Sequence, residues 1–142
     1  MKLATILMSA VSIFAAGTAF AAQYDRLPED EATTVNGIEV ACTGVGDEAI
    51  SDPRWRAYSV RLEFANGARE YLADLDVTVE RPSGDQLLAV RCSGPWLLVN
   101  LEPGKYRVQA TYEHRLSKTV LITAPDHGQK RVVISFPEVT GE

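Results

Sequence analysis

The sequence predicts an all-β protein, a β-sandwich of seven or eight short antiparallel strands with Greek-key connections. Apolar and polar residues alternate over 58–65, 71–80 and 106–113, a period of two that is typical of strands with one buried and one solvated face. Turn sequences such as Asn66-Gly67 and Pro103-Gly104 separate the runs at regular spacing. No segment has the pattern of a long helix, which favours a sandwich over a mixed fold.

The expected elements follow from the apolar runs and the turns between them. Asn66-Gly67 is a tight-turn sequence, so we expect it to join its two flanking runs in a hairpin. A short helical turn fits 47–56, where Pro53 limits its length. Pro82-Ser83-Gly84-Asp85 turns the chain into a strand that ends at Cys92. We expect strands at about 37–42, 58–65, 71–80, 88–92, 96–101, 106–112, 117–123 and 131–136.

The first residues fit a secretory signal peptide. Met1-Lys2 is a short basic start, an apolar run follows, and Ala19-Phe20-Ala21 supplies the small residues that a signal peptidase reads. No basic stop-transfer cluster follows the run, so we expect no stable membrane anchor and a periplasmic or secreted product. The expected divisions are a signal peptide at 1–21, a mobile polar and acidic leader at 22–35, and the folded domain at 36–137.

Two cysteines, Cys42 and Cys92, remain in this exported chain. An even number of cysteines in an oxidising compartment indicates a disulfide. Each cysteine also lies on the apolar side of its expected strand, so the two can meet across a core. The alternative is a redox or metal pair, but the sequence contains no Cys-x-x-Cys.

The charge balance argues against nucleic acid as a partner. The chain has 14 lysines and arginines against 19 aspartates and glutamates, a net charge of −5. Nucleic-acid binding depends on neutralising phosphates with basic side chains. An acidic domain with scattered arginines is therefore a poor candidate for that function.

The sequence of one expected turn resembles a turn sequence of a known protein family. The run Leu101-Glu102-Pro103-Gly104-Lys105-Tyr106 resembles the leucine-x-proline-glycine-x-tyrosine turn of carboxypeptidase regulatory-like domains, and the resemblance extends over about 57–136. It implies a transthyretin-type sandwich without chemistry of its own. In physical terms, Pro103 presets φ for the turn, Gly104 accepts a positive φ, and Tyr106 fills the core. The segment 44–48 is similar to one in small stand-alone periplasmic members of this family.

No catalytic constellation is visible in the sequence. The nucleophile elbow Gly-x-Ser-x-Gly is absent, and so is Cys–His zinc spacing. The two histidines, His114 and His127, fall in predicted hairpin tips at opposite ends of one strand. We therefore predict no catalytic, cofactor-binding or metal-binding residues and a protein that is not an enzyme.

Trp55 is the candidate contact residue. It lies between Arg54 and Arg56 in an irregular segment, and an aromatic residue beside arginines is a composition favoured at protein interfaces. We predict an interface at these three residues, with a cap over the open end of the sandwich as the alternative role for Trp55. Trp96 leads an apolar strand and is expected in the core.

The predicted function is that of a non-catalytic exported module that binds another envelope protein, through an exposed sheet edge that accepts a strand. One alternative is a ligand-binding domain for carbohydrate or calcium, with Asp74 and Asp76 beside Glu63 or Glu80 as the calcium ligands. A more remote alternative is a hydrolase accessory domain.

Overall fold

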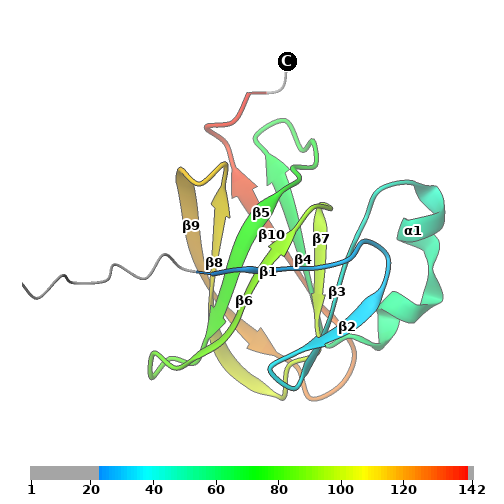
Figure 1. Ribbon diagram of the computed structural model, residues 1–142, viewed down its shortest axis with the longest axis vertical. Helices are drawn as coiled ribbons and strands as arrows, with labels where there is room; N and C mark the ends of the chain where they lie inside the picture. The colour runs from blue at the N-terminus through cyan, green and yellow to red at the C-terminus, as the bar shows by residue number, and fades with distance from the viewer. Residues whose placement is uncertain (1–22, 141–142) are drawn as a thin grey trace, which may run out of the picture.

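The computed structural model describes residues 23–140, and the predicted signal peptide lies outside the described residues. Two five-stranded sheets face each other, and two short helices lie outside them (Figure 1). The predicted all-β sandwich is confirmed. Two of the strands are short additions from the N-terminal segment, which brings the number to ten in the described part of the chain.

Sheet A has the strand order β1-β6-β5-β8-β9, and sheet B has the order β10-β4-β7-β3-β2. The strands of sheet A are β1 (Asp25–Arg26), β5 (Leu75–Glu80), β6 (Gln86–Cys92), β8 (Gly104–Tyr112) and β9 (Leu116–Ala124). The strands of sheet B are β2 (Ala32–Val35), β3 (Ile38–Thr43), β4 (Val60–Asn66), β7 (Trp96–Val99) and β10 (Lys130–Phe136).

The sheets are mixed rather than purely antiparallel. β10 runs parallel to β4 over its whole length, and β1 runs parallel to β6. The remaining strand pairs are antiparallel. The parallel pair of β4 and β10 arises because the chain leaves β9 at the edge of sheet A and crosses to the edge of sheet B. There β10 lies beside β4, which comes much earlier in the sequence.

The core lies between the sheets and is filled by alternate residues of both. Val60, Leu62 and Phe64 of β4 are fully buried, as are Val77 and Val79 of β5. The predicted Cys42–Cys92 disulfide is confirmed, with a Cα–Cα distance of 5.5 Å. It joins β3 of sheet B to β6 of sheet A, so it ties the two layers together through the core.

The predicted hairpin at Asn66-Gly67 is wrong. The turn forms, because the Asn66 side chain accepts hydrogen bonds from the backbone N–H groups of Ala68 and Glu70 at 2.9 and 3.0 Å. However, the return pairing is limited to one bridge, between Ala65 and Tyr71. Asp74 then adopts a positive φ of 60°, and the chain crosses to sheet A.

This crossing changes which side chains are buried. The predicted alternation places Tyr71 on the apolar face and Leu72 on the wet face, whereas Tyr71 is 49% exposed and Leu72 is buried. The left-handed residue Asp74 breaks the two-residue period, so the predicted alternation holds only from Leu75 onward. β4 is therefore free to pair with β7 and β10.

The predicted mobile leader is part of the sandwich. Within it, β2 pairs with β3, and β1 pairs with β6. Leu27 is buried in the core, and the Thr43 hydroxyl donates a hydrogen bond of 2.6 Å to the Asp30 carboxylate. Acidic composition suggested a solvated segment, but one buried leucine and main-chain pairing are enough to attach it.

The predicted helical turn at 47–56 is confirmed as two short helices, α1 (Asp47–Ser51) and η1 (Pro53–Ala57). Asp52 caps the second helix by accepting a hydrogen bond of 2.9 Å from the Arg54 backbone N–H. This segment, which we call the helical insert (47–57), packs Trp55 against the outer face of sheet B, where Trp55 forms a small cluster with Ala41, Tyr58 and Leu98.

The predicted turn motif is reproduced in part: the chain bends at Pro103, and Gly104 is already the first residue of β8. Gly104 has a φ of 146°, and Leu101 and Tyr106 are buried in the core. The Tyr106 hydroxyl donates a hydrogen bond of 2.7 Å to the Glu102 carbonyl. The Tyr106 ring packs in the core, and its hydroxyl group holds the segment that precedes β8.

We expect Tyr106→Phe to lower the free energy of unfolding by about 1 kcal/mol, because it removes this one hydrogen bond and keeps the ring. Urea unfolding measures the change. Tyr24→Phe, for which no side-chain hydrogen bond is found among the described residues, is the matched control with an expected change near zero. An equal loss in both variants would contradict the assigned role.

Candidate functional site

The outer face of sheet B carries a groove beside the helical insert, which forms one of its walls. Strand alternation places Arg61 and Glu63 of β4, Arg131 of β10 and Trp96 of β7 on this face, because their neighbours in sequence point into the core. The groove has a volume of about 440 Å³. We call it the arginine groove and define it by six of its lining residues: Arg56, Arg61, Glu63, Tyr71, Trp96 and Arg131.

A buried carboxylate organises the arginine groove. The Glu63 side chain is 1% exposed, and it accepts hydrogen bonds from Nε and Nη2 of Arg131. Arg61 Nε donates to the same carboxylate at 3.0 Å, and the Tyr71 hydroxyl donates at 3.2 Å. Two arginines and a tyrosine thus satisfy one glutamate.

The Glu63 carboxylate is ionised in this setting. Burial raises its pKa, but the hydrogen bond from Arg131 and the positive charges of Arg61 and Arg131 outweigh burial and hold the pKa below its ordinary value. Arg61 and Arg131 are direct register partners in the parallel pair of β4 and β10. Two like charges in adjacent strands would repel each other, and the Glu63 charge offsets this repulsion.

The arginines keep hydrogen-bonding capacity beyond Glu63. A guanidinium group has five N–H donors, and of these Arg61 uses Nε, while Arg131 uses Nε and Nη2. Arg56 also lines the groove, is exposed, and forms no side-chain hydrogen bond or ion pair with another described residue. Positive groups with unused donors therefore surround the groove.

Trp96 supports the arginine groove from β7. It is 5% exposed, so its predicted burial is confirmed, but it lies on the outer face of sheet B and not in the core between the sheets. The Arg61 guanidinium lies 4.3 Å from its ring centroid. This cation–π contact holds the guanidinium over the ring. The buried indole Nε1 has no hydrogen-bond partner in the described part of the chain.

Two further hollows adjoin the arginine groove along β10. One, of about 580 Å³, shares Glu63, Tyr71 and Arg131 with the groove and continues to Val133 and Ser135. The other, also of about 580 Å³, lies on the β9 side and is lined by Leu121, Val132 and Val133. Arg131 lines all three hollows, so β10 is at the centre of this surface.

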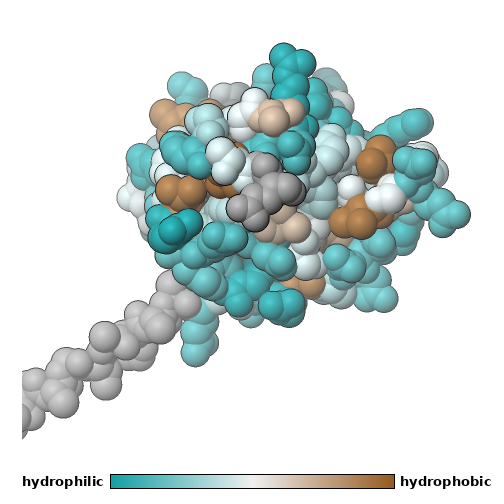
Figure 2. Space-filling view, turned by 90° about the horizontal axis from the view of Figure 1, so that it is seen from above, coloured by the Kyte–Doolittle hydropathy of each residue, from teal (hydrophilic) through white to brown (hydrophobic). Residues whose placement is uncertain are grey.

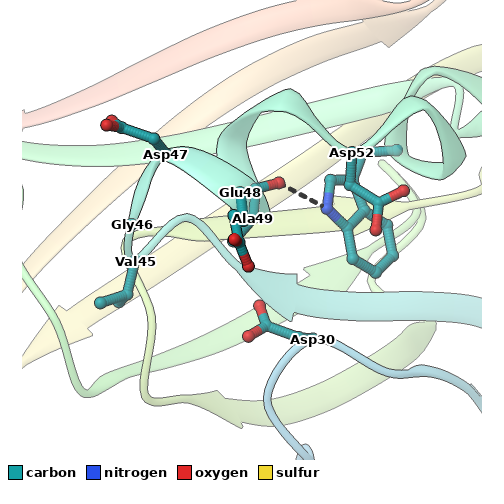
Figure 3. Close-up of a pocket in the computed structure, with 8 residues that line it drawn as sticks. Asp30, Val45, Gly46, Asp47, Glu48, Ala49 and Asp52 are labelled. Carbon is teal, nitrogen blue, oxygen red and sulfur yellow. Dashed lines mark hydrogen bonds between the residues drawn. The ribbon is translucent and has the colours of Figure 1, made fainter.

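A separate acidic hollow of about 410 Å³ lies between the N-terminal segment and α1. Figure 3 shows the carboxylates of Asp30 and Glu48 facing each other across it, while Asp47 points away. Asp52 is ion-paired with Arg54 at 2.7 Å, and Asp30 accepts the Thr43 hydroxyl. No group of three or more histidine, cysteine or acidic side chains in residues 23–140 is arranged to hold a metal ion.

The predicted interface residues have different environments. Trp55 is 3% exposed, and its indole N–H donates to the Ala49 carbonyl at 2.8 Å, so the prediction of an exposed contact side chain is wrong, as is a cap over the open end. A large aromatic ring can be buried on the outer face of a sheet when a short insert covers it. Arg54 pairs with Asp52 and lies over the Trp55 ring, and Arg56 lines the arginine groove.

The calcium ligands suggested by the sequence are not brought together. Asp76 is buried and bound by Arg91 at 2.6 Å, and His114 Nδ1 lies 3.0 Å from the same carboxylate. Asp74 precedes β5 in a left-handed conformation and is exposed. His114 and His127 lie in the turns at opposite ends of β9, as predicted.

No protein-family model matches this chain, and no curated protein matches it either. The resemblance to carboxypeptidase regulatory-like domains therefore stays a prediction. No helix in the described part of the chain is both long and apolar enough to cross a membrane.

Sequence reasoning missed the arginine groove. Arg61 and Glu63 were predicted on the wet face of their strand, and that alternation was the available signal. Arg131 joins them because β10 pairs with β4 in parallel, and a local pattern does not contain that pairing.

Proposed function

We propose that this protein is an exported, non-catalytic module that binds an extended segment of another envelope protein at the free edge of β10. The observation that carries the proposal is the position of β10. It is the terminal strand of sheet B and is paired with β4 on one side only. A strand edge of this kind offers main-chain donors and acceptors to an incoming segment.

The register identifies the backbone groups at the free edge. The Lys130 N–H donates to the Ser59 carbonyl beside β4, so Lys130 and every second residue after it face β4. Arg131, Val133 and Ser135 then present their N–H and C=O groups to the open side, because both groups of a strand residue point the same way. These three residues are exposed.

The side chains around this edge suit a peptide partner. Val133 is 48% exposed and Leu121 of β9 is 76% exposed, and they line the same hollow. On the end of the sandwich that Figure 2 shows, the apolar residues are scattered among hydrophilic ones and form no broad patch. The two exposed apolar side chains beside the β10 edge fit a narrow segment bound mainly through its main chain better than a large flat partner.

We expect Val133→Pro to abolish partner binding while the fold is kept. Proline removes the Val133 N–H, which points away from β4, and proline is tolerated on a strand edge with its nitrogen facing solvent. A photo-crosslinking residue at Ser135 reports the partner in the native envelope. The expected result is an adduct of defined mass that Val133→Pro eliminates and the matched control Val133→Thr retains.

Two outcomes would contradict the proposed function. One is an adduct whose yield is the same in Val133→Pro, and the other is no adduct when Val133 is intact. Thermal unfolding of both variants shows whether Val133→Pro is folded, so loss of the adduct is not confused with loss of structure.

A further inference from the structure

We infer that the arginine groove is an anion-binding site that takes a carboxylate from an acidic peptide segment. The inference rests on the proposed function, because the segment bound beside β10 is the molecule that brings the carboxylate. The carboxylate site would explain how the protein selects its partner. Main-chain hydrogen bonds at β10 do not depend on the sequence of the bound segment, whereas a carboxylate site favours segments with an acidic side chain.

The charge in the groove supports an anionic ligand. Arg56, Arg61 and Arg131 line it, and the single negative charge of Glu63 offsets only one of the two positive charges of Arg61 and Arg131. Asp52 also lines the groove, but its carboxylate accepts hydrogen bonds from Arg54 through both oxygens. The groove therefore carries excess positive charge, although the chain as a whole has a net charge of −5.

The donors are also held in place before a ligand arrives. The cation–π contact with Trp96 and the hydrogen bond to Glu63 hold Arg61, and two hydrogen bonds to Glu63 hold Arg131. Gln129 fixes the insert that carries Arg56, because its amide donates to the carbonyls of Trp55 and Tyr58 at 2.7 and 3.1 Å. Preorganised guanidinium groups lose less side-chain entropy when they bind a planar carboxylate.

A peptide fits this site better than a sugar does. Of the three aromatic residues that line the groove, Trp55 and Trp96 are 3% and 5% exposed and only Tyr71, at 49%, is accessible, so the groove offers a sugar little aromatic surface. In contrast, Arg131 belongs both to the groove and to the free edge of β10. A strand added to β10 places a side chain directly opposite Arg131, at the distance of a cross-strand pair. An acidic residue at that position would pair with the guanidinium.

The test uses two fluorescein-labelled nine-residue peptides of alternating glutamate and valine, or glutamine and valine, added to the protein purified from its host. Fluorescence anisotropy measures the Kd. We expect the glutamate peptide to bind at least 10-fold more tightly than the glutamine peptide, and the difference to shrink with added salt. Arg56→Gln should weaken the glutamate peptide about 5-fold. Arg56 holds no other described side chain, so the fold should be unaffected.

Arg115→Gln is the matched control, because Arg115 is an exposed arginine in the turn between β8 and β9, away from the groove. An unchanged Kd in this variant supports the site. Equal weakening in Arg56→Gln and Arg115→Gln would overturn it, since the effect would then come from net charge.

The remaining outcomes separate this inference from the proposed function. Equal binding of both peptides, lost in Val133→Pro, overturns the carboxylate site and leaves edge binding intact. Binding of the glutamate peptide that depends on Arg56 but not on Val133 supports the carboxylate site and contradicts edge binding. Binding of polygalacturonate in place of the glutamate peptide overturns the assignment to a peptide.

Discussion

Loss of the Cys42–Cys92 disulfide is expected to lower the free energy of unfolding by about 4 kcal/mol. The bridge closes a loop with a sequence separation of 50 residues, and the chain-entropy model gives about 4 kcal/mol for a loop of that length. The unfolded chain gains freedom when the bridge is absent, while the core around it loses little volume. Urea unfolding of the double variant Cys42→Ala/Cys92→Ala against the native chain measures the difference.

Reductant provides the matched control for this prediction. It should destabilise the native chain and leave the double variant unchanged, because the variant has no bridge to reduce. A loss below about 1 kcal/mol would contradict the role assigned to the loop, and it would mean that the unfolded chain is already restricted in other ways.

Replacement of Glu63 is the second large effect that we expect. Glu63→Gln should lower the free energy of unfolding by about 3 kcal/mol, the lower end of the range for breaking a buried ion pair. The lower end applies because Arg131, one of the two partners, is 57% exposed and can turn into solvent. Without the Glu63 charge, Arg61 and Arg131 repel each other in adjacent strands.

The same substitution should change how stability depends on pH. The pKa of Glu63 in the folded protein is below its ordinary value of 4.5, so its contribution to stability is present above that pH. The contribution is lost as the pH falls through the folded pKa, because protonation breaks the pairs with both arginines. Stability curves between pH 7 and pH 3 should therefore fall less steeply for Glu63→Gln than for the native chain.

Glu70→Gln is the control for both measurements, because Glu70 is exposed and no side-chain hydrogen bond is found for it among the described residues. It should leave the stability and its pH dependence close to those of the native chain. Parallel pH curves for the native chain and Glu63→Gln would show that Glu63 is not the charged centre of the groove.

Glu63 should affect ligand binding as well as stability. If the carboxylate holds Arg61 and Arg131 in place, its removal should weaken binding of the glutamate peptide even where the protein stays folded. The groove would then contain a positioning residue that does not itself touch the ligand. The Kd of the glutamate peptide distinguishes this role from a purely structural one, because the pH curve reports only that the pairs with the arginines contribute to stability.

The sequence by itself determined the features that depend on neighbouring residues. Alternation placed Val60, Leu62 and Phe64 in the core, because successive side chains of a strand point to opposite faces. Gly104 adopts a positive φ, as predicted, and the parity of Cys42 and Cys92 with the buried residues was enough to predict their bridge. These features need no knowledge of which strands are neighbours.

The tertiary structure decided everything that depends on pairing between distant strands. At Asp74, which has a left-handed conformation, the chain crosses to sheet A. The predicted hairpin therefore does not form, and β4 pairs with β10. That pairing set Arg131 beside Arg61 and made Glu63 the buried centre of a groove, and the helical insert buried Trp55. A local pattern determines which face of its own strand a side chain occupies. It does not determine which strand lies next to that one, because strand pairing depends on the packing of the whole chain.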